Sequence, residues 1–215
     1  MMHSVKLPDF ISSFDFAPMC DLYRKWNEHI NLISRKDIDN VWEHHILHSM
    51  GIALYLASEC PGVFERWRSG EVSVLDVGCG GGFPGIPLSA VFPNVSFTLC
   101  DSIGKKVRVA GEVASALGLG NVRCVQSRVE DLDGQWDYVV SRAVTSLDNF
   151  LPLVEGKYRE SILYLKGGDL SAELSACRAK LGGRMPEVSQ WKLSNVFEDE
   201  YYAEKLVVNL GNSKI

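Results

Sequence analysis

The chain predicts an α/β fold: a mainly parallel, twisted sheet with helices on both faces, preceded by an α-helical cap at the N-terminus. In the second part of the chain, short β-rich runs alternate with helical patterns, and five of them are roughly 20 to 25 residues apart, as in βαβ units. The runs are almost continuously apolar, which is typical of strands buried on both faces. The first part has helical spacing instead. We therefore predict a helical cap over residues 1–70 and one compact core over residues 71–215.

The helical cap is predicted from apolar residues that recur three and four positions apart. They are Met19, Leu22, Tyr23, Trp26 and Ile30. A second amphipathic run follows over residues 39–60, and Pro61, Gly62 and Gly70 then interrupt the pattern.

The core is predicted from six apolar runs that read as strands. They cover residues 72–78, 95–101, 122–127, 136–142, 161–167 and 205–210. A helical pattern over residues 104–120 stops at Gly118 and Gly120, as the C-terminus of a helix commonly does.

Composition excludes several classes of protein. With 46% hydrophobic and 23% charged residues, the chain is an ordinary globular one. It shows no signal-peptide pattern and no apolar run long enough to cross a bilayer, so we expect an unexported, cytoplasmic protein without a membrane contact. Its six scattered cysteines form no CxxC pair, which favours reduced thiols and gives no support for a metal. The net charge of −5 excludes coating of nucleic acid by phosphate neutralisation alone, although a local basic face is compatible with it.

A glycine-rich loop follows the first predicted strand, in the stretch "VSVLDVGCGGGFPGIPLSAVF". Ligands of doubly wound sheets bind at the carboxyl ends of the strands, and glycines there let a ligand approach the backbone. A dinucleotide loop needs G-x-G-x-x-G, but Phe83 stands at the third position. The spacing of Asp76, Gly78, Gly80 and Gly82 instead resembles the D-x-G-x-G-x-G motif of S-adenosylmethionine-dependent methyltransferases. A purely structural turn is the alternative.

Asp101 ends the second predicted strand, 23 positions after Gly78. A carboxylate at this place can accept hydrogen bonds from both ribose hydroxyls of a nucleoside. The alternative is an aspartate that caps the following helix. The glycine loop upstream favours the ribose role.

From Tyr23 to Lys166 the chain resembles the glucose-inhibited division protein B family, the bacterial enzymes that methylate N7 of a guanine in 16S ribosomal RNA. The resemblance rests on "YRKWNEHINLIS", "DVGCGGGFPGIPLS", "LCDSIGKK", "QSRVEDL", "VVSRAVTSL" and "LKGG". It implies a Rossmann-like class I methyltransferase, S-adenosylmethionine as methyl donor, and 16S ribosomal RNA as partner, within the small subunit or an assembly intermediate.

The resemblance also implies the residues of the donor site. They are Gly78, Gly80 and Phe83 in the glycine loop, Asp101 at the ribose, Val129 and Glu130 beside the adenine, and Arg142. The resemblance implies that Arg142 contacts the methyl donor or the substrate. Its place at a strand end would equally suit an arginine that holds a structural carboxylate. The chain departs from the family pattern at His48 and Cys79 and in its acidic tail, which concerns RNA contact more than the donor site.

The acceptor chemistry is indicated by what the sequence lacks. "VVSRAVTS" contains no N/D-P-P-aromatic motif of the amine-methylating enzymes, and no cysteine follows a proline, as is often the case in cytosine-C5 enzymes. Guanine N7 has an in-plane lone pair and needs neither a base nor covalent attack, so no catalytic side chain is predicted and positioning supplies the acceleration. The candidates for RNA contact are Lys105, Lys106, Arg108, Arg123, Arg128, Arg142 and Lys166, with ordinary surface solvation as an equal alternative.

Two other functions stay open from the sequence: a methyltransferase for a small molecule or a protein, and a non-catalytic nucleotide-binding factor in ribosome assembly. His44 and His48 have a spacing compatible with a metal, but without an HExxH motif packing inside the cap is favoured. Trp26, Trp42 and Trp67 are likewise expected to pack in the cap or the core rather than to stack on bases.

Overall fold

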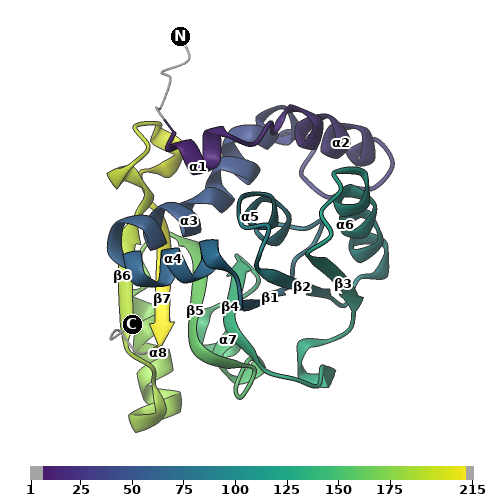
Figure 1. The fold of residues 1–215 in the computed structure, drawn as a ribbon. Helices are drawn as coiled ribbons and strands as arrows, with labels where there is room; N and C mark the ends of the chain where they lie inside the picture. Colours follow the sequence, from purple (N-terminus) through teal and green to yellow (C-terminus); the bar gives the residue numbers. More distant parts are fainter. Residues whose placement is uncertain (1–6, 212–215) are drawn as a thin grey trace.

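The computed structural model describes residues 7–211 and contains one seven-stranded sheet of order β3-β2-β1-β4-β5-β7-β6 (Figure 1). Strands β1 to β5 are parallel, whereas β7 runs antiparallel to β5 and β6 antiparallel to β7. The strands are β1 (Ser73–Val77), β2 (Ser96–Asp101), β3 (Val122–Gln126), β4 (Trp136–Arg142), β5 (Tyr158–Gly167), β6 (Val188–Lys192) and β7 (Lys205–Gly211). The prediction of a mainly parallel α/β sheet is confirmed.

The sequence pattern missed one strand, β6 (Val188–Lys192). In this strand only Trp191 is buried, so its sequence, VSQWK, lacks the continuous apolar run that marks the inner strands. It lies at the edge of the sheet, where β7 is the one strand that it pairs with among the described residues.

The helices before the first strand are α1 (Asp9–Ser12), α2 (Ala17–Asn27), the 3-10 turn η1 (Ile38–Asn40), the π-helix η2 (Val41–Leu47), α3 (His48–Glu59) and α4 (Pro61–Ser69). Between the strands lie α5 (Gly85–Val91), α6 (Gly104–Ala116), α7 (Leu147–Leu153) and α8 (Ser171–Leu181). Short 3-10 turns complete the chain: η3 (Val129–Asp131), η4 (Gly182–Arg184), η5 (Leu193–Asn195) and η6 (Glu200–Tyr202).

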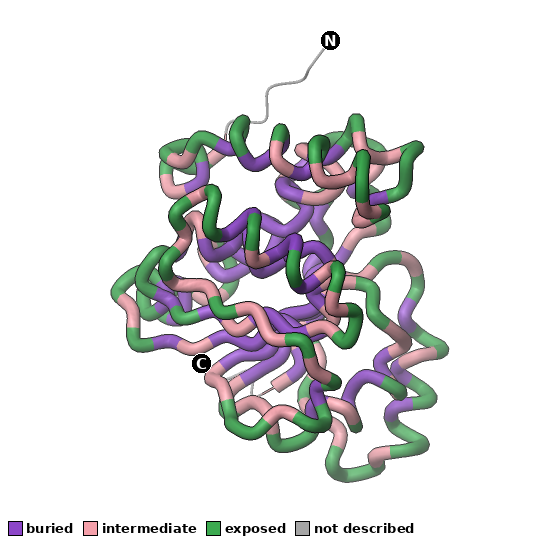
Figure 2. Tube along the Cα trace, turned by 90° about the vertical axis from the view of Figure 1, so that its right-hand side faces the viewer, coloured by how far each residue is buried: buried purple, intermediate pink, exposed green. Residues whose placement is uncertain are grey.

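Each face of the sheet has its own hydrophobic cluster, and Figure 2 shows the buried segments gathered between helices and strands. One cluster joins side chains of α2 to α6 to the sheet, and the other joins α7 and α8 to the opposite face. The predicted helices on both faces are thus present. The N-terminal helices share their cluster with the sheet, and Trp67 of α4 is fully buried against Tyr138 of β4. The boundary at residue 70 stays a prediction.

The tryptophans lie where core or cap packing was expected. Trp67 is in the core, Trp42 packs on Phe16 at 5.4 Å between ring centroids, and Trp26 is partly buried against the same cluster. Within residues 7–211, no helix has the length and apolar character needed to cross a membrane. The six cysteines are free thiols.

The sheet topology determines where a ligand can bind. The central strand β1 has β2 on one side and β4 on the other, so the chain order reverses at β1. Helices α5 and α6, which follow β1 and β2, pack on one face, whereas α7, which follows β4, packs on the other, and this leaves a crevice at the carboxyl ends of the strands.

Candidate functional site

A cavity of about 590 Å³ lies at the carboxyl ends of β1, β2 and β4. Its walls come from the glycine loop after β1, the turn after β2, the segment before and within η3, and the loop after β4. All predicted donor-site residues line this cavity: Gly78, Gly80, Phe83, Asp101, Val129, Glu130 and Arg142. The fold therefore brings together positions that are up to 64 residues apart in the sequence, as expected from the sequence analysis.

Gly78 and Gly80 of the loop both have a positive φ, which favours glycine, but their surroundings differ. Gly78 has a φ of +66°, and a Cβ there would lie 2.4 Å from a methyl carbon of Val144 in the loop after β4. Gly80 has a φ of +55°, but no atom lies within 4 Å of the place of its missing Cβ. Gly78 thus permits close packing of two loops, and Gly80 leaves its wall of the cavity open to a ligand.

Phe83 connects the glycine loop to the N-terminal helices. Its buried ring lies 4.4 Å from the ring of Tyr23 in α2, and the Tyr23 hydroxyl donates to the Gly81 carbonyl at 2.9 Å. Leu32, from the segment between α2 and η1, also lines the cavity and lies over Gly81. The N-terminal helical region therefore supplies part of the cavity wall.

The Asp101 carboxylate is held by two backbone N–H groups, and the helix α6 that follows it has no side-chain cap. One carboxylate oxygen accepts from the Gly80 backbone N–H at 2.9 Å, and the other from the Ile103 N–H at 2.8 Å, just before α6. The carboxylate also lines the cavity. Because each oxygen has a second lone pair, these backbone contacts orient Asp101 and leave acceptor capacity for hydroxyl groups of a ligand.

The opposite wall carries Val129 and Glu130 in the turn η3. Val129 is buried beneath the cavity, whereas Glu130 is exposed. An apolar floor with an adjacent carboxylate suits a flat heterocycle with an exocyclic amine, which is the environment that adenine needs.

Arg142 ends β4 and is enclosed between the cavity and the N-terminal helices. Its guanidinium lies 4.9 Å from the centre of the Phe83 ring and donates to the His44 carbonyl at 3.3 Å and to a ring nitrogen of His45 at 3.0 Å. Burial lowers the pKa of Arg142, and the nearby Tyr201 and other acidic groups oppose this effect. An arginine keeps its charge in proteins, so Arg142 gives this end of the cavity a fixed positive charge.

The loop after β4 is held firmly in place. Ala143 has a φ of +48°, which is uncommon for a residue other than glycine. The Tyr164 hydroxyl accepts from the N–H groups of Val144 and Thr145 and donates to the Thr145 carbonyl at 3.0 Å. Val144 is 42% exposed at the cavity. The sequence motif "VVSRAVTS" marked this loop, but not the strained backbone that presents Val144.

Asp76 was part of the motif but not a predicted site residue, and its environment is unusual. It is fully buried, and one carboxylate oxygen accepts from the Gly85 N–H at 2.8 Å. Among the described residues, the other oxygen has no hydrogen-bond partner. Burial raises the pKa of Asp76 to about 7, although the Gly85 hydrogen bond and Arg142 oppose the rise.

Two cysteines line the cavity, and burial disfavours the thiolate form of both. Burial raises the pKa of Cys79 well above its usual range and that of Cys100 to about 11. Because only the thiolate is a strong nucleophile, these side chains are unsuited to covalent attack at neutral pH.

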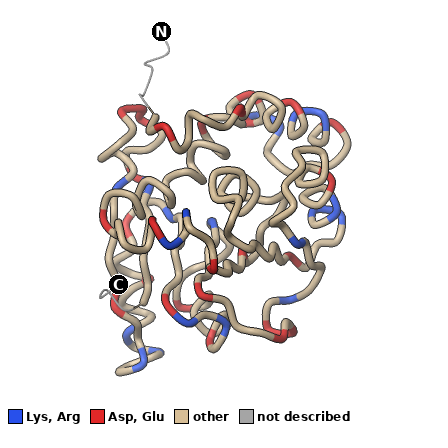
Figure 3. The backbone as a smooth tube through the Cα atoms, in the orientation of Figure 1, with Lys and Arg blue, Asp and Glu red and all other residues tan. Residues whose placement is uncertain are grey.

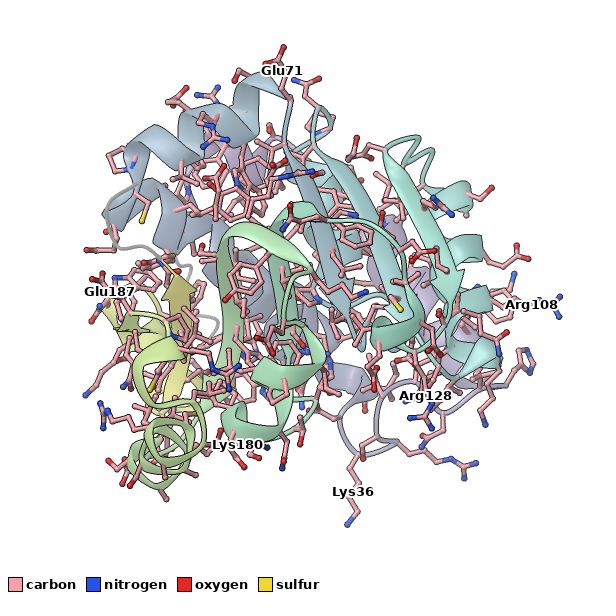
Figure 4. All side chains as sticks on the ribbon, turned by 90° about the horizontal axis from the view of Figure 1, so that it is seen from below. Lys36, Glu71, Arg108, Arg128, Lys180 and Glu187 are labelled. Carbon is pink, nitrogen blue, oxygen red and sulfur yellow. The ribbon has the colours of Figure 1, made fainter. Side chains whose placement is uncertain are left out.

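The predicted RNA contacts differ in their position. Lys106 and Arg128 line the cavity, whereas Lys105 and Arg108 are exposed on α6 and Arg123 is exposed near the start of β3. Figure 3 shows basic residues along α6 and near α2, with acidic residues between them. In Figure 4, Arg128 and Lys36 project from the edge of the molecule that lies opposite Glu71, the residue two positions before β1. Lys36 was not among the candidates.

The surroundings of Lys166 do not agree with its prediction as an RNA contact. Its ammonium donates to the Thr145 carbonyl at 3.0 Å and pairs with Glu173 at 2.9 Å, and its side chain is only 9% exposed. Lys166 therefore supports the loop after β4 and is not presented as a surface cation. The "LKGG" motif placed it at a strand end but could not show that Glu173 of α8 reaches it.

The histidines join the N-terminal helices to the tail. The His44 ring stacks on Tyr201 at 3.7 Å, and His48 Nδ1 lies 3.2 Å from the Tyr201 hydroxyl. His44 and His45 both contact Asp37. Within the described part of the chain, no group of three or more His, Cys, Asp or Glu side chains is placed to hold a metal.

The architecture and the site define the class of protein. A similar fold occurs in the magnesium protoporphyrin IX methyltransferase of Synechocystis PCC 6803, solved with bound S-adenosylmethionine, with a TM-score of 0.63 and 15% identity over 97% of this chain and 100% of that chain. The glycine loop and Asp101 are compatible with such a donor, because the loop leaves a backbone wall open and the Asp101 carboxylate that lines the cavity can accept hydrogen bonds from hydroxyl groups. The fold is therefore one that S-adenosylmethionine-dependent methyltransferases adopt.

Sequence comparisons then identify the family. A family model described as rRNA small subunit methyltransferase G (GidB) matches residues 15–195, and the chain belongs to this family. The ribosomal RNA small subunit methyltransferase G of Flavobacterium johnsoniae is 46% identical over 203 residues, covering 91% of this chain and 88% of the relative. Its counterpart from Christiangramia forsetii is 44% identical over 211 residues, covering 94% and 90%. The resemblance stated from the motifs is confirmed.

Proposed function

We propose that this protein transfers the methyl group of S-adenosylmethionine to N7 of a guanine in 16S ribosomal RNA of the small subunit. The family match supports ribosomal RNA as the substrate. The structure supports N7 as the acceptor by one observation: the loop after β4 brings Arg142, Ala143 and Val144 to the cavity, with no carboxylate or thiolate among them. Methylation of an exocyclic amine must remove a proton, whereas guanine N7 presents a free lone pair.

The side chains of the cavity have separate roles in this proposal. Bound S-adenosylmethionine supplies an activated methyl group on a sulfonium. Asp101 accepts the ribose hydroxyls, Val129 and Glu130 hold the adenine, and the Gly80 wall admits the amino acid end. Arg142 and Val144 then border the place where the guanine enters. Holding the two reacting atoms about 3 to 3.5 Å apart provides most of the acceleration, because no proton transfer is needed.

The cavity cysteines do not suit cytosine-C5 methylation, because that reaction needs a thiolate nucleophile. Cys79 and Cys100 border the cavity, but their raised pKa values keep them protonated at neutral pH. This favours direct transfer to a ring nitrogen over a covalent mechanism.

The exposed cations near the cavity are proposed to contact the RNA backbone. Arg128 and Lys106 lie at the cavity itself, and Lys105, Arg108 and Arg123 extend the surface along α6 and β3. These few contacts give a modest, salt-sensitive affinity. The target guanine is expected in a loop or unstacked state, because N7 is hard to reach in the deep major groove of A-form RNA. We further propose that the enzyme acts in the cytoplasm on the small subunit or an assembly intermediate.

The experiment uses tritiated S-adenosylmethionine with small subunits, naked rRNA and total protein as separate acceptors. We expect label in 16S RNA only, and a new strand break after borohydride and aniline treatment, which cleaves at N7-methylguanine. Labelled RNA without a new break would overturn the N7 assignment, and label in protein or small molecules would favour another methyltransferase. No calorimetric heat with S-adenosylmethionine would favour a non-catalytic assembly factor.

A matched pair of variants tests the site. Asp101→Asn removes the charge at the ribose position, and Asp133→Asn removes the same charge from an exposed residue outside the cavity. We expect the first to lower donor affinity on the order of tenfold, which is about one hydrogen bond to a charged group, and the second to leave it unchanged. Equal donor affinities in the two variants would contradict the ribose role of Asp101.

A further inference from the structure

Arg142 is connected to a carboxylate through a histidine. Its guanidinium donates to Nδ1 of His45 at 3.0 Å, and Nε2 of the same ring lies 2.8 Å from a carboxylate oxygen of Asp37. Among residues 7–211, Arg142 makes no direct ion pair. The sequence left open that Arg142 holds a structural carboxylate, and the structure shows contact with Asp37 by way of His45.

The roles of the two ring nitrogens follow from these partners. Arginine only donates, so Nδ1 of His45 must be the acceptor, and the proton must lie on Nε2, where the Asp37 carboxylate accepts it. The imidazole is thus neutral and in one tautomer. Consistent with this, burial and then Arg142 lower the pKa of His45 to about 4, with Asp37 in opposition.

The local backbone directs both histidines at the same carboxylate. His44 and His45 lie in the π-helix η2, and both contact Asp37, with His44 Nδ1 2.5 Å from the second oxygen. π-helical turns are rare and often occur at functional sites. The His45 ring is also 5.3 Å from that of Phe83, on which Arg142 stacks. The histidine therefore orders two side chains of the cavity wall.

We propose that His45 and Asp37 are positioning residues for methyl transfer: they hold the Arg142 guanidinium so that its remaining N–H groups face an oxygen of a ligand in the cavity. This rests on the proposed function. Two hydrogen bonds, to His45 and to the His44 carbonyl, leave N–H groups of Arg142 for the cavity it lines. The oxygen belongs either to the carboxylate of the methyl donor or to O6 of the guanine, and both have the same acceptor chemistry.

Three variants separate positioning from packing. His45→Leu removes both hydrogen bonds, His45→Gln keeps an acceptor and a donor on one planar group, and His48→Leu removes another buried histidine that touches Tyr201 instead of Arg142. We expect His45→Leu to lower kcat on the order of tenfold, as a small misplacement of a positioning group does. His45→Gln and His48→Leu should stay within about threefold of the parent.

The kinetic and binding constants of His45→Leu identify which oxygen Arg142 faces, that of the donor carboxylate or O6 of the guanine. A raised KM and calorimetric Kd for S-adenosylmethionine in His45→Leu would assign it to the donor, and an unchanged donor Kd with a lower kcat/KM for RNA would assign it to the guanine. Combining His45→Leu with Asp37→Asn should cost no more than His45→Leu alone, because both changes break the same chain of contacts. Additive losses would overturn the proposal, and so would equal losses in His45→Leu and His45→Gln.

A spectroscopic readout does not depend on the RNA substrate. The ¹⁵N NMR spectrum of the His45 imidazole should show the neutral tautomer with the proton on Nε2 at pH 7, and an imidazolium or the other tautomer would overturn the proposal. If the parent protein binds S-adenosylmethionine but methylates no RNA, the proposed function fails while this readout and the donor Kd still decide the role of His45.

Discussion

Replacing Asp76 by asparagine should remove a specific pH dependence of stability. Asp76 is fully buried, and its pKa is raised from 3.8 to about 7, first by burial and further by the nearby Asp101. The folded protein therefore binds this proton more tightly than the unfolded chain. The stabilising contribution is complete below about pH 4, is lost progressively as the pH rises, and is gone above about pH 7.

The magnitude follows from the two pKa values. The difference between 3.8 and about 7 corresponds to about 4 kcal/mol in the free energy of unfolding, or about 1.4 kcal/mol per pH unit between them. Asparagine keeps an oxygen that accepts from the Gly85 N–H but does not titrate. Its amide N–H groups take the place of an oxygen without a partner, which adds a cost that is independent of pH.

The assay is urea unfolding of the parent and of Asp76→Asn at pH 5, 6, 7 and 8, without S-adenosylmethionine. We expect the stability of the variant relative to the parent to rise by about 2 kcal/mol from pH 5 to pH 7, because Asp76 is half titrated at about pH 7, and then to level off. The comparison must be made between the two proteins, because burial lowers the pKa of His45 to about 4 and also lowers the pKa of His48. Their contribution to stability therefore rises with pH up to about 6.5, opposite to that of Asp76. Parallel curves for the two proteins would refute a buried, titrating Asp76.

Three further outcomes are expected. Gly78→Ala places a Cβ 2.4 Å from Val144 at a positive φ, so the free energy of unfolding should fall by about 1 to 3 kcal/mol in urea titrations. Adding Val144→Ala should restore part of this loss. An unchanged free energy of unfolding in Gly78→Ala would contradict the close packing. Tyr23→Phe removes the buried hydrogen bond to the glycine loop and should cost about 1 kcal/mol by the same measurement, whereas an unchanged midpoint would show that this bond contributes nothing. Arg128→Gln should reduce the salt dependence of RNA binding by about one phosphate contact. Lys166→Gln should lower thermal stability and leave the salt dependence of RNA binding unchanged, because Lys166 pairs with Glu173. The opposite result for the two variants would contradict their placement.

Much of the donor site could be predicted because its residues lie in short local motifs. The glycine loop and Asp101 each follow a strand with a clear apolar pattern, and parallel strands bring their carboxyl ends to one edge. Leu32 was missed as a lining residue although it lies within a family marker, and Asp37 was missed as the partner of His45, because the local sequence does not show which distant segments these side chains meet.

The same limit explains the error at Lys166. A lysine at a strand end beside a predicted cleft has the same pattern whether it is exposed or paired. Only the packing of α8 shows that Glu173 reaches it, and that the Thr145 carbonyl accepts a second hydrogen bond from it.

The α/β class and the mainly parallel sheet could be predicted from strand periodicity, which is a local property of the chain, and the resemblance of short motifs indicated the methyl donor and the family. The tertiary structure alone decided the environments: that Asp76 is buried without a full set of partners, that Gly78 packs under Val144, and that Arg142 reaches Asp37 through His45. Burial and pairing depend on side chains that meet from distant segments, and a linear pattern does not specify which of them will meet.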